Sequence, residues 1–186
     1  MPFASQDPIT AAQLSEYPGH EQYELVRGQL KVCEPPGGEH GQIATRLASR
    51  LHPHVEQAGL GTVLIEAGYV LSRNPDTVRG PDVSFVRAEQ LDPAKVPATF
   101  LSLAPDLAVE IVSPTDRPAT VADRVREYLD AGTTVVWVVD PRARQVTVHR
   151  EGGLVRTVAG ADLLEGDEVV PGFTCPLTDI FGPPPQ

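Results

Sequence analysis

The chain has 186 residues and a formal net charge of −10 at pH 7, and its hydrophobic (41%) and charged (22%) fractions are those of an ordinary globular protein. The acidic charge argues against a protein that holds nucleic acid through a broadly basic surface. Two cysteines, Cys33 and Cys175, are too few and too far apart for a disulfide framework or a zinc site.

The first third of the chain predicts a short helix, a hairpin and a long helix. The short helix is expected in residues 9–18, where Thr10 can cap its start. Residues 23–35 predict a hairpin whose two strands flank Arg27-Gly28. The long helix is expected in residues 37–59 and carries a stripe of residues at helical spacing: His40, Ile43, Ala44, Leu47, Leu51 and Val55.

The middle of the chain predicts strands that are separated by turns and a loop. Residues 61–73 contain one or two strands, with Gly68 at a bulge or turn, and residues 82–86 form another. Residues 87–105 contain three prolines and predict a loop with a short helix. Residues 106–112 are apolar enough for a central strand.

The last third predicts an amphipathic helix at 117–132, a strongly apolar strand at 133–140, and an alternating meander at 145–159. The strand–helix–strand unit that ends at Asp140 requires a right-handed crossover between parallel neighbours. We therefore expect the α/β class: a restriction-endonuclease-like mixed β-sheet flanked by helices.

The length favours one domain, expected over residues 1–186 with a core at about 10–181 and a frayed tail at 182–186. No apolar run is long enough to span a bilayer, and the N-terminus lacks the pattern of a secretory signal. We therefore expect a cytoplasmic protein without membrane partners.

An acid stands inside the strand predicted at 106–112. Alternation puts Glu110 on the same face as Ala108 and Val112, which is apolar beside it. A lone carboxylate in such a place must be paired, bound to a metal or protonated. The alternative is that Glu110 faces solvent or pairs with an arginine.

A second acid, Asp82, follows Pro81 at the start of the strand at 82–86. If that strand lies beside the strand at 106–112, Asp82 and Glu110 converge at one edge of the sheet. Two converging carboxylates repel unless a cation lies between them, and oxygen ligands favour Mg²⁺ or Mn²⁺ over zinc. Such a metal can activate water and stabilise a departing phosphate oxygen. The alternative for Pro81-Asp82 is ordinary turn chemistry.

Six sequence stretches follow one another between about Thr10 and Phe181: YELVRGQL, PPGGEHGQIATRL, GPDVSFV, APDLAVEIVSPTDR, EYLDAGTTVVWVVDP and VVPGFTCPLTDIF. In this order they resemble the Uma family of restriction-endonuclease-like proteins, within the PD-(D/E)XK nuclease superfamily. The resemblance implies an αβββαβ core, hydrolysis of phosphodiester bonds with Mg²⁺ or Mn²⁺, DNA as the substrate, and a homodimer.

The resemblance also implies roles for particular residues. Asp82 and Glu110 become the catalytic acids that hold the metal. The superfamily's lysine would fall at Val112, but members of this family often carry it on the following helix, four positions before a tyrosine. This chain has Arg124 there, before Tyr128. Arg124 is the third candidate catalytic residue; an arginine contacts phosphate but does not readily give up a proton. Its alternative is a surface arginine lying over the sheet edge.

Two further residues are second-tier candidates. The resemblance places an acid at Glu24, which would add a metal ligand or hold water; the alternative is a hairpin residue facing solvent. His40 lies near the N-terminus of the long helix, where backbone N–H groups favour phosphate. Its alternative is a satisfied core histidine.

Two functions compete on these observations. The first is a Mg²⁺-dependent DNA endonuclease. The second is a nuclease-fold binding module for nucleic acid or protein that cuts weakly or not at all, which the acidic charge and the missing lysine favour. A hydrolase built on Ser113 lacks the GxSxG pattern, so we expect a turn there. Glu127 is expected on a solvated helix face, and Trp137 in the core.

Overall fold

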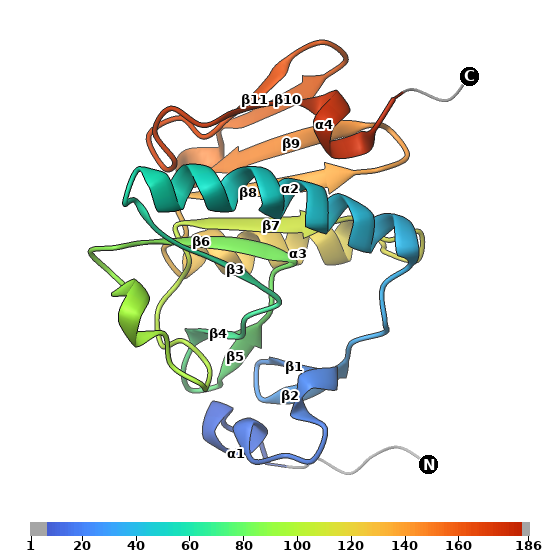
Figure 1. Ribbon diagram of the computed structural model, residues 1–186. Helices are drawn as coiled ribbons and strands as arrows, with labels where there is room; N and C mark the ends of the chain where they lie inside the picture. The colour runs from blue at the N-terminus through green and yellow to red at the C-terminus, as the bar shows by residue number, and fades with distance from the viewer. Residues whose placement is uncertain (1–6, 184–186) are drawn as a thin grey trace.

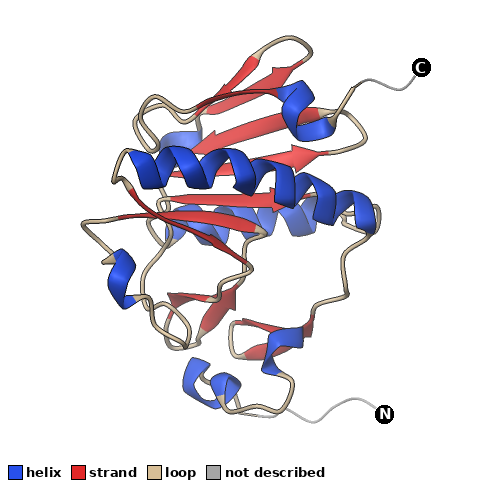
Figure 2. Ribbon diagram, viewed as in Figure 1, coloured by secondary structure: helices blue, strands red, loops and turns tan. Residues whose placement is uncertain are grey.

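The computed structural model describes residues 7–183 (Figures 1 and 2). Its helices are α1 (Ala11–Ser15), α2 (Gly38–Gln57), α3 (Pro118–Asp130) and α4 (Leu177–Phe181). The large sheet contains β3 (Gly61–Ile65), β6 (Val83–Arg87), β7 (Leu107–Ile111), β8 (Val135–Asp140), β9 (Gln145–Arg150) and β10 (Val155–Ala159). A smaller sheet contains β1 (Tyr23–Val26), β2 (Gln29–Val32), β4 (Tyr69–Ser72) and β5 (Thr77–Arg79), and β11 (Leu163–Glu165) pairs with β12 (Thr174–Pro176).

The large sheet runs in the order β10-β9-β8-β7-β6-β3, with α2 on one face and α3 on the other (Figure 1). β3, β6 and β7 are antiparallel neighbours, while β7 and β8 are parallel and joined through α3. The order α2-β3-β6-β7-α3-β8 confirms the expected αβββαβ core and the mixed α/β class.

Local sequence explains where the helices begin and end. The side chain of Thr10 accepts a hydrogen bond from the backbone N–H of Gln13, and the Gln13 side chain accepts one from the backbone N–H of Thr10, so this reciprocal pair caps the N-terminus of α1. Gly59, just beyond α2, has a φ of 63°, a left-handed conformation that costs glycine little. These helix predictions are confirmed.

The two faces of β7 pack against different helices, as alternation predicts. Leu107, Val109 and Ile111 lie in the main core, which includes the stripe of α2 and the buried Trp137. Ala108 lies in a smaller cluster beneath α3. Glu110 therefore shares the α3 face of the sheet.

Residues 61–73, where the sequence predicts one or two strands, contain two. This run forms two strands that belong to different sheets: β3 joins the large sheet and β4 the small one. The strand β5, which the sequence did not indicate, pairs with both β4 and β1. The strand β3 pairs antiparallel with β6 rather than with β4, the next strand in the chain.

The C-terminal elements β11, β12 and α4 were also not anticipated, because each is short. Part of the expected frayed tail, residues 184–186, lies outside the described residues. Among the helices in residues 7–183, none is long and apolar enough to cross a membrane.

Candidate active site

The two acids singled out in the sequence meet where β6 begins and β7 ends. The ladder between β6 and β7 ends where Val83 lies opposite Val109, and Asp82 and Glu110 are the next residues of the two chains. They lie close enough for the charge of Asp82 to raise the pKa of Glu110, although Asp82 contacts His40 of α2 and Glu110 contacts α3. The backbone N–H of Ile111 donates to Asp82 Oδ2 at 2.6 Å, which ties the start of β6 to the end of β7.

Glu110 is buried under α3, with only 5% of its surface exposed. The hydroxyl of Tyr128 donates to Glu110 Oε1 at 2.8 Å, and Arg124 Nη1 donates to Oε2 at 3.1 Å. Both donors come from one face of α3, because residues four apart are neighbours on a helix. The alternative in which Glu110 pairs with an arginine is thus present in the structure, inside the core rather than at the surface.

Burial raises the pKa of the Glu110 carboxyl to about 8, because water no longer stabilises its anion. The like charges of Asp82 and Glu24 act in the same direction, and the Arg124 guanidinium opposes them. Burial also raises the pKa of the Tyr128 hydroxyl well above its ordinary value, so this group remains a donor. A positive charge placed beside Glu110 would therefore favour its ionised form.

Arg124 uses only part of its guanidinium on protein partners. Nη1 contacts Glu110 Oε2 and lies 3.9 Å from Asp116 Oδ1. Nε is buried without a hydrogen-bond partner in the part of the chain that the structure describes, and Nη2 forms no hydrogen bond there either. The Nε–Nη2 edge is the one that forks onto two oxygens of a phosphate or carboxylate.

His40, near the start of α2, contacts the other acid. Its Nε2 lies 3.1 Å from Asp82 Oδ2, and both side chains are mostly buried. The hydrogen bond to Asp82 raises the pKa of His40, although burial acts in the opposite direction. Asp82 Oδ2 thus receives both the Ile111 N–H and the His40 imidazole.

Glu24, on β1, has both carboxylate oxygens occupied by protein donors. Its Oε2 lies 2.6 Å from Arg79 Nη1, and its Oε1 accepts the backbone N–H of Gly80 at 3.1 Å. Glu24 is buried, so it is not the solvent-facing hairpin residue of the alternative. Val112, at the lysine position of the superfamily, packs partly buried beside the cluster under α3.

The fit of a divalent cation depends on Asp82 and Glu110. Within residues 7–183 there is no group of three or more His, Cys, Asp or Glu side chains that could hold a metal. Mg²⁺, however, is usually bound by one or two carboxylates, with water and substrate phosphates supplying the remaining ligands. Asp82 and Glu110 supply two such carboxylates, and both oxygens of Glu110 also have protein donors.

Sequence reasoning missed Arg79 and misplaced Glu127. Glu127 does not belong to a fully solvated face, because its Oε2 accepts from Arg79 Nε at 2.7 Å. Arg79 ends the three-residue strand β5, which was itself not predicted, so no periodic signal pointed to it. The other assignments hold: the N–H of Ser113 donates to Asp116 in a turn, and Trp137 is buried.

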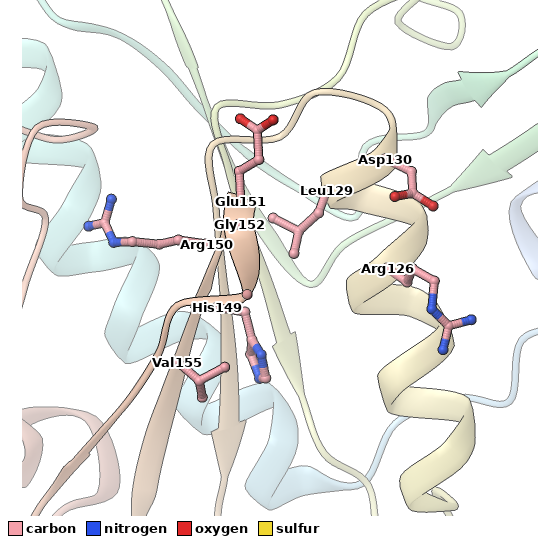
Figure 3. Close-up of a pocket in the computed structure, with 9 residues that line it drawn as sticks. Arg126, Leu129, Asp130, His149, Arg150, Glu151, Gly152 and Val155 are labelled. Carbon is pink, nitrogen blue, oxygen red and sulfur yellow. The ribbon is translucent and has the colours of Figure 1, made fainter.

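A pocket of about 460 Å³ lies away from the acids, between α3 and the turn that joins β9 and β10 (Figure 3). Arg126 and Asp130 line it from α3, and His149 lines it from β9 (Figure 3). The guanidinium of Arg150 forms ion pairs with Asp167 and Glu168. None of the candidate site residues lines this pocket, so we do not assign the chemistry to it.

Comparison with known proteins shows the family to which the chain belongs. The profile of the Uma2 family, described as "Putative restriction endonuclease", matches residues 11–178. No curated protein matches the chain. Among solved structures, the fold is similar to the crystal structure of a "putative nuclease belonging to DUF820" from Anabaena variabilis ATCC 29413, with a TM-score of 0.82 and 22% identity over 94% of this chain and 98% of that chain. At 22% identity, this structural similarity shows that the two proteins share a fold.

Proposed function

Because the chain belongs to the Uma2 family, we propose that it is an endonuclease that uses Mg²⁺ or Mn²⁺ to hydrolyse phosphodiester bonds in DNA. The observation that carries the proposal is that Asp82 and Glu110 lie close together where β6 begins and β7 ends, with the partly unused guanidinium of Arg124 beside them. The family description and the nuclease-like fold support it.

Asp82 and Glu110 would hold the cation. When bound there, a divalent cation supplies Lewis acidity toward a phosphate oxygen and lowers the pKa of water. The protein's part is to keep the two carboxylates in place. Tyr128 holds Glu110 through Oε1, while the Ile111 N–H and His40 hold Asp82 through Oδ2.

Arg124 would contact the scissile phosphate through Nη2. This nitrogen has no partner among residues 7–183, whereas Nη1 is anchored to Glu110 and Nε is buried. A guanidinium held in this way stabilises the negative charge that develops on the phosphate oxygens, and the surrounding apolar packing strengthens its effect. Because arginine keeps its proton, Arg124 orients and stabilises but does not act as a base.

The test of this function replaces each acid by its isosteric amide. We expect Asp82→Asn and Glu110→Gln to lose at least about 100-fold in the rate of cutting supercoiled plasmid DNA in Mg²⁺ or Mn²⁺, with unchanged circular dichroism. The matched control is Asp123→Asn, which removes an acid from an exposed ion pair with Arg126 on α3. An Asp82→Asn protein that cuts as fast as the parent would overturn the assignment.

A second candidate function has its own support. Val112 stands where the superfamily carries its lysine, and both oxygens of Glu110 already have protein partners. These features suit a nuclease-fold module that binds nucleic acid or protein without cutting. Intact supercoiled and linear DNA after long incubation in both metals, together with a gel shift, would favour the module over the enzyme.

A further inference from the structure

We propose that a buried ion triad, formed by Glu24, Arg79 and Glu127, positions the two candidate metal-binding carboxylates without itself contacting metal or substrate. The proposal rests on the proposed function, since it concerns how the same acids are held. The triad joins three elements that are far apart in the sequence: β1, β5 and α3. It assigns a role to Arg79 and changes the expected role of Glu24.

Arg79 is the centre of the triad. Its side chain is 7% exposed, with Nη1 2.6 Å from Glu24 Oε2 and Nε 2.7 Å from Glu127 Oε2. A buried charge is tolerated only when it is paired and hydrogen-bonded, and a guanidinium can do this with two carboxylates because its N–H groups are fixed in a fork. Arg79 thereby fixes the distance between β1 and α3.

One arm of the triad leads to Asp82. Glu24, held by Arg79 through Oε2, accepts the backbone N–H of Gly80 through Oε1 at 3.1 Å. Between Gly80 and Asp82 stands only Pro81, whose ring restricts its φ. Fixing Arg79 and Gly80 therefore leaves the chain little freedom before Asp82.

The other arm leads to Glu110. Glu127, on α3, lies one turn after Arg124 and next to Tyr128, the two residues that hold the Glu110 carboxylate. Positions three apart on a helix share a face, so the ion pair between Arg79 and Glu127 keeps that face of α3 turned toward the sheet. The triad thus ties the segment that carries Asp82 to the helix that secures Glu110.

This geometry argues against a metal-ligand role for Glu24. Releasing Glu24 from Arg79 would leave a guanidinium that is only 7% exposed without this partner, whereas Arg124, the partner of Glu110, is 25% exposed. Glu24 is therefore a positioning residue. A merely structural triad would contribute to stability alone, whereas a positioning triad also changes the surroundings of Asp82 and the affinity for metal.

The first experiment needs no metal. In ¹⁵N NMR spectra of the metal-free protein, the imidazole signals of His40 report its contact with Asp82. We expect Arg79→Lys, which keeps the charge but loses the fork, to shift these signals. The matched control is Arg126→Lys, which makes the same change in the exposed pair with Asp123 and should leave them as in the parent.

The second experiment measures Mn²⁺ binding by titration calorimetry. We expect Arg79→Lys and Glu127→Gln to raise the dissociation constant about 10-fold, at the lower end of the loss seen when partners of metal ligands are removed. The controls Arg126→Lys and Asp123→Asn should bind as the parent does. If Arg79→Lys does not fold, Glu127→Gln decides, because that side chain is 23% exposed and tolerates the loss of its charge better.

The outcomes separate this proposal from the proposed function. Folded Arg79→Lys and Glu127→Gln proteins with parental His40 signals and parental Mn²⁺ affinity would overturn the positioning role. If the parent binds no Mn²⁺ and cuts no DNA, the proposed function fails, and the His40 signals alone decide whether the triad positions Asp82.

Discussion

Among the single residues of the molecule, the unusual one is Glu110, an acid whose side chain is buried in the protein. Glu110 has two protein donors, yet burial still raises its pKa to about 8. If Glu110 served only as the ion-pair partner of Arg124, an ordinary carboxyl pKa would stabilise the pair more, because Glu110 would then be charged at neutral pH. The proposed function requires a cation beside Glu110, and such a charge would favour the ionised form of this carboxyl.

The raised pKa predicts how stability changes with pH in the absence of metal. The folded protein holds a proton on Glu110 between the ordinary value of 4.5 and about 8, whereas the unfolded chain does not, so the free energy of unfolding falls as pH rises through this interval. Glu110→Gln removes this dependence. Urea unfolding of both proteins in EDTA at several pH values across the interval measures it, and equal slopes would contradict the prediction.

A second prediction concerns the donor to Glu110. Tyr128→Phe removes a hydroxyl that donates at 2.8 Å and leaves a buried carboxyl oxygen without its partner, so we expect a loss of about 1–3 kcal/mol in the free energy of unfolding. Tyr17→Phe, at an exposed tyrosine, is the control and should change stability little. A Tyr128→Phe protein as stable as the control variant would show that this bond contributes nothing.

At the scale of the element, the sequence predicted well wherever one pattern decided the outcome. Alternation in β7 placed Glu110 on the correct face, and the stripe of α2 and the Gly59 stop located that helix. The strands β6 and β7 are neighbours, as the predicted convergence of Asp82 with Glu110 required.

The sequence did not predict the features that depend on pairing between distant segments of the chain. One or two strands were predicted at 61–73, but the sequence did not indicate that the two would pair with partners in different sheets. β5 is only three residues long and has no periodicity, so neither it nor the pairing of Arg79 with Glu24 and Glu127 could be anticipated. Ion pairs between distant elements leave no local signal in one sequence.

The packing of α2 provides the prediction at this scale. Leu47 is fully buried against the large sheet, so Leu47→Ala should cost about 2–5 kcal/mol through lost burial and the cavity that it leaves. Thr45→Ala, on the exposed side of the same helix, is the control. Chemical unfolding measures both variants, and a cost below that of the control would show that α2 does not pack as described.

At the scale of the whole molecule, the charge of −10 constrains how DNA could be held. The acids exceed the basic residues, 25 to 15, so attraction to the phosphate backbone must be local. Without a cation, the Asp82 carboxylate repels a phosphate brought to Arg124. We therefore predict that DNA binding by gel shift is weaker in EDTA than in Ca²⁺, and that the difference disappears in Asp82→Asn. Equal binding in both conditions by the parent would contradict this.

Crystals soaked in Mn²⁺ would show whether Asp82 and Glu110 together hold one divalent cation. We expect an anomalous difference peak between the two carboxylates, at about 2.0–2.6 Å from an oxygen of each. The absence of a peak there, in crystals of a protein that cuts DNA in Mn²⁺ solution, would contradict it.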